Sequence, residues 1–247
     1  MSNLKKILLI ALLLSFGMGT GFAQEVDLPA FTKLVVSPDI NLILVKGEKE
    51  SIRMDFSGID EEKINYRVKG KKLQVFLDKA RLLPKYKKER HGYSRNSYNI
   101  YKGAMVTAYV TYTDLTKLVI RGEEDAVCKS PIEAKKFRLK VYGESDVKLA
   151  SVDAKKLKLN LKGENYVKIS AGKVETQVYK SYGENEVKSK GLIAQKSKVK
   201  SYGEGRVSIN STDKVVVTSL GEVDVRYEGT AKLSKGIILG ESDIIKK

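Results

Sequence analysis

The chain has 247 residues, which is enough for one large domain or two smaller ones. Hydrophobic residues make up 42% of it, with only four prolines and no tryptophan, so the composition excludes an intrinsically disordered chain. The formal net charge is +16, with lysine and arginine spread over the whole length. This charge indicates either a solvated, lysine-rich surface or attraction to polyanions.

The first 23 residues have the pattern of a secretory signal peptide. Lys5 and Lys6 precede an apolar run from Ile7 to Phe16, and small residues follow up to Ala23. The apolar run is shorter than the roughly 20 residues that a membrane-spanning helix needs, and no later segment is apolar enough to span. We therefore expect cleavage after Ala23 and one exported domain over residues 24–247.

Period-two alternation of apolar and polar residues predicts β-strands through the N-terminal third of the chain. Two of these strands are expected to form a hairpin across Gly70 and Lys71, because a two-residue loop that begins with glycine favours this turn. The expected strand segments are residues 31–36 and 40–45 around a turn at 37–39, then residues 52–56, 64–68, 73–77 and 105–112.

The alternation stops in a basic insertion at residues 79–103, which is rich in lysine, arginine and tyrosine. Loops of this length in a compact domain are usually functional or disordered. Interleaved basic and aromatic residues suit the binding of a nucleic-acid strand or a sugar chain, although a solvated excursion has the same composition. The candidate polyanion-binding residues are Lys79, Arg81, Lys85, Tyr86, Lys87, Lys88, Arg90 and Arg95.

The C-terminal half, residues 115–247, is a repeat in which a Gly-Glu pair recurs at steps of 18 to 21 residues. Such a period indicates a stack of like units, and period-two alternation within each unit excludes a helix. Coils that rise by about 4.8 Å each would together bury an apolar face that one coil cannot bury alone. The pairs are Gly122-Glu123, Gly143-Glu144, Gly163-Glu164, Gly183-Glu184, Gly203-Glu204, Gly221-Glu222 and Gly240-Glu241.

The N-terminal strands resemble this unit. Residues 115–120 closely repeat residues 31–36, and residues 123–126 take the position of residues 39–42. We interpret the N-terminal strands as a degenerate copy of the repeat, so that both halves share one architecture with less regular coils at the N-terminal end.

In a stacked arrangement the glycines and the glutamates form two columns. The glycines have a structural cause, because a tight corner needs a positive φ. A column of like charges is destabilising unless it is matched. Two interpretations follow: neutralisation by the flanking lysines, including Lys140, Lys180 and Lys200 three places before a glycine, or Ca²⁺ binding as in β-rolls. The nonapeptide of β-rolls is absent and the chain is basic, so we favour neutralisation and expect no metal or cofactor.

The chain contains few of the residues that form a catalytic or zinc-binding site. Cys128 is its one cysteine and His91 its one histidine, too few for the usual zinc ligand set. Cys128 lies in a strand pattern and is interpreted as a small buried residue. The only acid–base candidates are Glu89 and His91, within the basic insertion.

Residues 31–36 with 41–44, the serial Gly-X-X-Asp-Val units, and the ending around residues 225–230 and 240–244 resemble the putative auto-transporter adhesin, head-GIN domain family. The resemblance covers residues 28–247. It implies a right-handed, single-stranded β-helix-like solenoid that is exported in Gram-negative bacteria, to the periplasm or the cell surface. The sequence departs from the family by placing Glu after each glycine and by the basic insertion.

Three functions remain open. The first is a non-enzymatic adhesin or envelope protein that binds a surface polysaccharide or another envelope protein, with no specific nucleic acid as partner. The second is a polysaccharide-active enzyme, since β-helices host lyases and hydrolases. The third is a structural scaffold of the periplasm. Unpaired strand edges at the solenoid ends would also allow a homo-oligomer.

Overall fold

The structure, a computed structural model, describes residues 21, 22, 24–91 and 94–247. It is nearly all β, with 74% of its residues in strands, and the strands wind into a β-solenoid of about six turns. The expected all-β solenoid is therefore confirmed. Most of the predicted signal peptide lies outside the described residues, and Gly21–Phe22 form the short strand β1.

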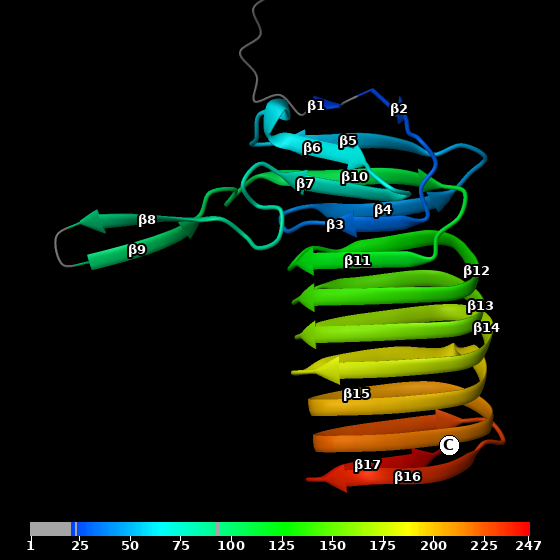
Figure 1. Cartoon of the computed structure of the whole chain (residues 1–247). Helices are drawn as coiled ribbons and strands as arrows, with labels where there is room; N and C mark the ends of the chain where they lie inside the picture. Colours follow the sequence, from blue (N-terminus) through cyan, green and yellow to red (C-terminus); the bar gives the residue numbers. More distant parts are fainter. Residues whose placement is uncertain (1–20, 23, 92–93) are drawn as a thin grey trace, which may run out of the picture.

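Four long strands carry the repeat and wrap around the solenoid (Figure 1). They are β12 (Ala126–Gly143), β13 (Asp146–Gly163), β14 (Asn165–Tyr182) and β15 (Asn185–Glu228), and each pairs in parallel with the next. Each coil has one segment that runs into a corner glycine and one that leaves it. The segments running in form the pre-corner wall, residues 117–122, 136–143, 156–163, 176–183, 196–203 and 214–221. Those leaving form the post-corner wall, residues 126–130, 146–150, 165–170, 185–190, 205–210 and 223–228.

Glycine is required at the corners for two reasons. Gly163 has a φ of +106°, a region that residues with a side chain rarely adopt. A Cβ atom on Gly163 would also lie 2.1 Å from the carbonyl oxygen of Gly143 in the preceding coil. That oxygen accepts a hydrogen bond from the backbone nitrogen of Glu164 at 2.9 Å. The close approach of neighbouring coils is the second reason, and the sequence alone did not indicate it.

The first coil of the stack is built from residues far away in the sequence. Strands β3 (Lys33–Val36) and β4 (Asn41–Lys46) lie parallel to β11 (Lys117–Gly122) and to the start of β12. Leu34 lies beside Leu118 and Leu42 beside Ala126. This register confirms that the N-terminal strands are a degenerate copy of the repeat.

Residues between β4 and β11 fold over the N-terminal end of the stack. Strand β7 (Lys72–Leu77) pairs with β3 and with β6 (Ile64–Val68), across Gly70 and Lys71 as predicted. Strand β10 (Met105–Tyr112) lies parallel to β4 and antiparallel to β5 (Ser51–Ser57). The 3₁₀ turn η1 (Glu61–Lys63) and strands β1 and β2 (Val26–Asp27) complete this less regular end. At the opposite end, β16 (Lys232–Leu239) and β17 (Ser242–Lys246) pair only with β15 among the described strands.

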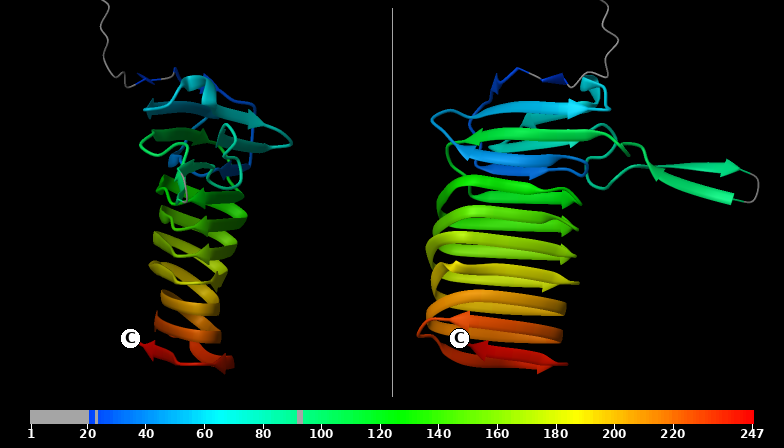
Figure 2. Two further views of the ribbon diagram at one scale, coloured as in Figure 1. Left: turned by 90° about the vertical axis from the view of Figure 1, so that its left-hand side faces the viewer. Right: turned by 180° about the vertical axis from the view of Figure 1, so that it is seen from behind.

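The basic insertion contains regular structure, where the sequence indicated an irregular stretch. Strands β8 (Tyr86–His91) and β9 (Ser94–Asn99) form a separate, antiparallel two-stranded sheet. This hairpin projects from the edge of the solenoid at which β11 ends, and the right-hand view of Figure 2 agrees with Figure 1 on this. The interpretation was wrong because alternation of polar residues alone, without an apolar face, gave no strand signal.

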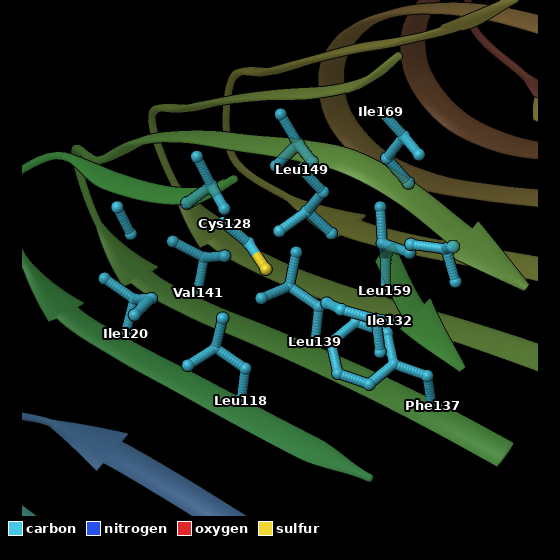
Figure 3. Packing of buried hydrophobic residues seen from close by; sticks show 14 of the residues in the cluster. Leu118, Ile120, Cys128, Ile132, Phe137, Leu139, Val141, Leu149, Leu159 and Ile169 are labelled. Atoms are coloured by element: carbon cyan, nitrogen blue, oxygen red, sulfur yellow. The ribbon is translucent and has the colours of Figure 1, made fainter. Parts of the chain in front are cut away.

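Apolar side chains from both walls meet inside the first coils (Figure 3). Leu118, Leu139 and Leu159 lie in register on the pre-corner wall and are fully buried. Cys128 is 2% exposed in the same cluster, as expected. Burial raises the pKa of the Cys128 thiol, which lies 3.5 Å from the Tyr112 hydroxyl.

The interior becomes polar in the next coils. Tyr179 takes the position beside Leu159, and its buried hydroxyl donates to Gln177 Oε1 at 2.6 Å. The Gln177 amide donates to the Ser197 hydroxyl at 2.7 Å, and the Tyr179 and Ser189 hydroxyls are 2.7 Å apart. Burial raises the pKa of Tyr179. Because each of these groups has a partner, the polar interior avoids the cost of unpaired buried groups.

Candidate binding surfaces

The candidate residues of the basic insertion do not share one surface. Lys79 and Arg81 lie on the body of the solenoid next to β7. The Lys79 Nζ is 4.0 Å from a carboxylate oxygen of Asp78. The Arg81 guanidinium donates to Gln74 Oε1 at 2.9 Å and lies 5.4 Å from the centre of the Phe76 ring. Arg81 is therefore engaged by neighbouring side chains of the body.

The remaining candidates belong to the hairpin. Lys85 and Tyr86 stand at its base, where Tyr86 is 50% exposed and the carbonyl of Lys85 accepts a hydrogen bond from the Ile100 nitrogen. The other candidates fall on β8 and β9, but their side chains lie outside the described residues, as do those of the acid–base candidates Glu89 and His91. These basic candidates are Lys87, Lys88, Arg90 and Arg95.

Partly buried hydrogen bonds anchor the base of the hairpin to the N-terminal end of the solenoid. The Tyr101 hydroxyl donates to the Asp78 carbonyl at 2.6 Å, and Asn99 Nδ2 donates to Asp39 Oδ1 at 2.6 Å. Burial raises the pKa of Asp39, and the hydrogen bond from Asn99 opposes this only in part. Burial likewise raises the pKa of Glu124 in the adjacent coil, with a smaller contribution from the charge of Asp39. The hairpin thus leaves the solenoid at a site with two destabilised carboxylates.

The outer face of the pre-corner wall, from residue 117 to residue 220, carries charge of a single sign. These strand segments contain no aspartate or glutamate. Their parallel register places basic side chains next to one another in successive coils, for example Arg138 beside Lys158 and Lys180 beside Lys200. We call this surface the basic face. Its thirteen basic residues are Lys117, Arg121, Lys136, Arg138, Lys140, Lys156, Lys158, Lys162, Lys180, Lys196, Lys198, Lys200 and Lys214.

The basic face is short of counter-charges. Within the described part of the chain, only Lys196 of these residues forms an ion pair, with Asp213 at 3.6 Å. Desolvation first, and then the charges of Lys140, Arg138 and other basic neighbours, lower the pKa of Lys117. The pKa of Lys158 is lowered for the same reasons. Like charges at strand spacing repel one another, so the cations of the basic face destabilise each other. Binding of an anionic ligand would reduce this repulsion.

The post-corner wall carries charges of both signs instead. In three of its segments an acidic residue stands two places before a basic one, and these side chains pair along the strand. Lys148 lies 2.7 Å from Asp146, and Arg226 lies 2.8 Å from Asp224. Lys188 and Glu186 form an equivalent pair at 3.1 Å. Positive charge is therefore concentrated on one wall of the solenoid.

The corner glutamates are exposed, and the last five of them line a groove of about 600 Å³ along the last coils. Among the described side chains, no ion pair joins one of them to Lys140, Lys180 or Lys200, so the predicted neutralisation by these lysines is wrong. These lysines project from the basic face and not over the corner. In the described residues, no group of three or more His, Cys, Asp or Glu side chains is placed to hold a metal ion. The acidic residues of the groove are Glu164, Glu184, Glu186, Glu204, Glu222, Asp224, Glu241 and Asp243.

Tyrosines border the basic face next to the corner. The rings of Tyr182 and Tyr202 stack with centroids 4.9 Å apart and 6° between their planes. The Lys162 Nζ lies 5.4 Å from the centre of the Tyr182 ring, and the Arg121 guanidinium lies 5.1 Å from that of Tyr142. Tyr182 and Tyr202 thus each turn one ring face toward the other, and they remain 41% and 36% exposed.

The basic face is not evident along the chain, because its lysines and arginines lie about 20 residues apart and become neighbours only when the coils stack. Writing the repeat in rows of about 20 residues aligns Lys117, Arg138, Lys158 and Lys198 in one column. The same layout separates these residues from the three post-corner segments in which an acidic residue stands two places before a basic one. The signal was therefore present in the sequence.

Known structures share this fold. A putative adhesin from Bacteroides fragilis is 19% identical, with a TM-score of 0.73, over 92% of this chain and 99% of its own. A putative adhesin from Parabacteroides merdae is 14% identical, with a TM-score of 0.66, over 92% and 95%. A putative lipid binding protein from Parabacteroides distasonis is 15% identical, with a TM-score of 0.64, over 92% and 96%. At these identities the likeness establishes the fold alone.

No curated protein matches the chain. Among the described residues, none of the helical segments has the length and apolarity to cross a membrane. The family model described as putative auto-transporter adhesin, head GIN domain, matches residues 30–231, which is most of the chain. The chain therefore belongs to the family of putative auto-transporter adhesins with a head GIN domain.

Proposed function

We propose that the protein is a non-enzymatic adhesin, exported to the periplasm or cell surface of a Gram-negative bacterium, that binds an acidic polymer of the cell envelope. The observation that carries this proposal is the separation of charge between the two walls. Twelve of the thirteen cations of the basic face form no ion pair with a described side chain, whereas each of the four acidic residues of the post-corner wall pairs with a cation of the same wall. A surface of this kind attracts polyanions over distances comparable to the Debye length.

Two further observations support the proposal. The family description and two of the neighbouring structures carry the word adhesin, and a third is named for lipid binding. The hairpin adds the basic candidates of β8 and β9 at the N-terminal end. Because the hairpin stands clear of the body, it would extend the contact with a long polymer beyond the solenoid (Figure 1).

The test is the binding of the purified protein to polysaccharide extracted from the envelope of the producing cells, measured at several salt concentrations. Binding driven by released counter-ions weakens linearly in log affinity against log salt. Salt-independent binding, or none, would contradict the proposal. A variant with Lys85, Lys87, Lys88, Arg90 and Arg95 changed to Gln separates the hairpin's part from that of the basic face.

The enzymatic alternative has a direct assay. Incubation of the same polysaccharide with the protein should release no new reducing ends or unsaturated products. Product formation that disappears in Glu89→Gln or His91→Ala variants would overturn the non-enzymatic assignment.

A further inference from the structure

The basic face contains one depression that could hold part of a ligand. A depression of about 240 Å³ is lined by six side chains that form a grid of three coils by two positions. Arg138 and Lys140 stand in the first coil, Lys158 and Asn160 in the second, and Val178 and Lys180 in the third.

The depression exists because two short side chains replace cations in this grid. Asn160 lies beside both Lys140 and Lys180 in its column, and Val178 lies beside Lys158 in the other. The short side chains form a floor between four long basic ones. No carboxylate lines the depression, and none of its four cations forms an ion pair with another described side chain.

We propose that this depression binds the acidic group of a linear glycan, a sulfate or a carboxylate, with the chain lying along the solenoid axis. The inference rests on the proposed function and names its ligand class. Arg138 offers a planar pair of N–H donors that suits either group, and the three lysines supply charge. Asn160 contributes an amide that can hydrogen-bond a sugar hydroxyl or ring oxygen.

The orientation follows from the fold. Along the axis, cations recur in successive coils at about the strand spacing of 4.8 Å, and the pre-corner segments that carry them contain no acidic residue. Pockets for drug-sized ligands measure about 300 to 1,000 Å³, so the depression accommodates one acidic substituent while the rest of the polymer crosses the face.

Two other polyanions fit less well. Binding of single-stranded nucleic acid uses exposed aromatic faces as stacking platforms, but the Tyr182 and Tyr202 rings stack on each other. An anionic membrane is usually held by inserted apolar side chains as well as charge. The exposed apolar residues of the pre-corner wall, such as Leu220, lie away from the depression, whose one apolar member, Val178, is only partly exposed.

The test uses the full protein and three immobilised or suspended probes: heparin, polygalacturonate, and vesicles containing phosphatidylglycerol. The first variant changes Arg138, Lys140, Lys158 and Lys180 to Gln. Its matched control changes Lys129, Lys155, Lys168 and Lys173 to Gln, which removes the same charge outside the basic face. We expect the first variant to lose at least about tenfold in affinity for a glycan, because the small contributions of four exposed ion pairs with the ligand add up. The control should lose much less affinity.

A second variant, Val178→Tyr, fills the floor without changing the charge. We expect it to weaken glycan binding several-fold while the unfolding midpoint stays near that of the wild type. Heparin and polygalacturonate distinguish a sulfate from a carboxylate as the preferred group.

Each of the remaining outcomes of the binding experiment refutes a defined part of the proposal. Equal losses in the first variant and the control would refute the depression and leave the proposed function standing. Binding to vesicles but to neither glycan would refute the ligand class. Failure to bind either glycan, vesicles or envelope polysaccharide would refute the proposed function itself.

Discussion

Replacing Gly163 by Ala perturbs a corner at which two requirements coincide. The new Cβ would lie 2.1 Å from the Gly143 carbonyl oxygen, so the two coils must separate locally. The positive φ costs about 1 to 3 kcal/mol for a residue with a side chain. Loss of the 2.9 Å hydrogen bond from Glu164 adds about 0.5 to 1.5 kcal/mol. We expect a total loss of about 2 to 4 kcal/mol in unfolding free energy.

The matched control is Gly70→Ala, because Gly70 also has a positive φ but nothing lies within 4 Å of the added Cβ. Its expected cost is about 1 to 2 kcal/mol, from the backbone conformation alone. Urea unfolding followed by circular dichroism gives the two midpoints, which are compared directly because stacked coils need not unfold in one step. A midpoint shift for Gly163→Ala no larger than that for Gly70→Ala would refute the role of inter-coil contact.

Three further predictions concern the interior and the base of the hairpin. Tyr179→Phe leaves its buried partners unsatisfied and should destabilise the protein by about 1 to 3 kcal/mol in urea unfolding, whereas Tyr182→Phe, at a residue that is 41% exposed, should have little effect. Burial raises the pKa of Asp39, so its contribution to stability falls as pH rises above the ordinary value of 3.8. Asp39→Asn should therefore gain stability relative to the wild type from acid to neutral pH, and a constant difference would contradict this. Cys128, buried with a raised pKa, should be alkylated by iodoacetamide only after unfolding, which mass spectrometry detects.

Much of the fold was predictable because the repeat is local and its period is regular. The match between residues 31–36 and 115–120 predicted a shared architecture, and the structure places Leu34 directly beside Leu118. The hairpin across Gly70 and Lys71 followed from turn chemistry alone. These features depend on short-range rules that a single sequence contains.

Features that depend on contacts between coils were not predicted. Gln177 and Tyr179 look unsuited to an interior position, and only the partners Ser189 and Ser197 from neighbouring segments make them acceptable. The basic face likewise arises from register, since lysines about 20 residues apart become neighbours. For the same reason Lys140 was assigned to the corner glutamates although it projects from a different surface.

The most direct test of the account is a footprint of lysine acetylation on the purified protein, with and without polysaccharide from the native envelope. Mass spectrometry gives the rate at each lysine. We predict that the polymer slows acetylation of Lys140, Lys158 and Lys180 on the basic face and leaves Lys129 and Lys168 on the post-corner wall unchanged. Equal protection of both walls, or protection of the post-corner wall alone, would contradict the claim that the basic face is the binding surface.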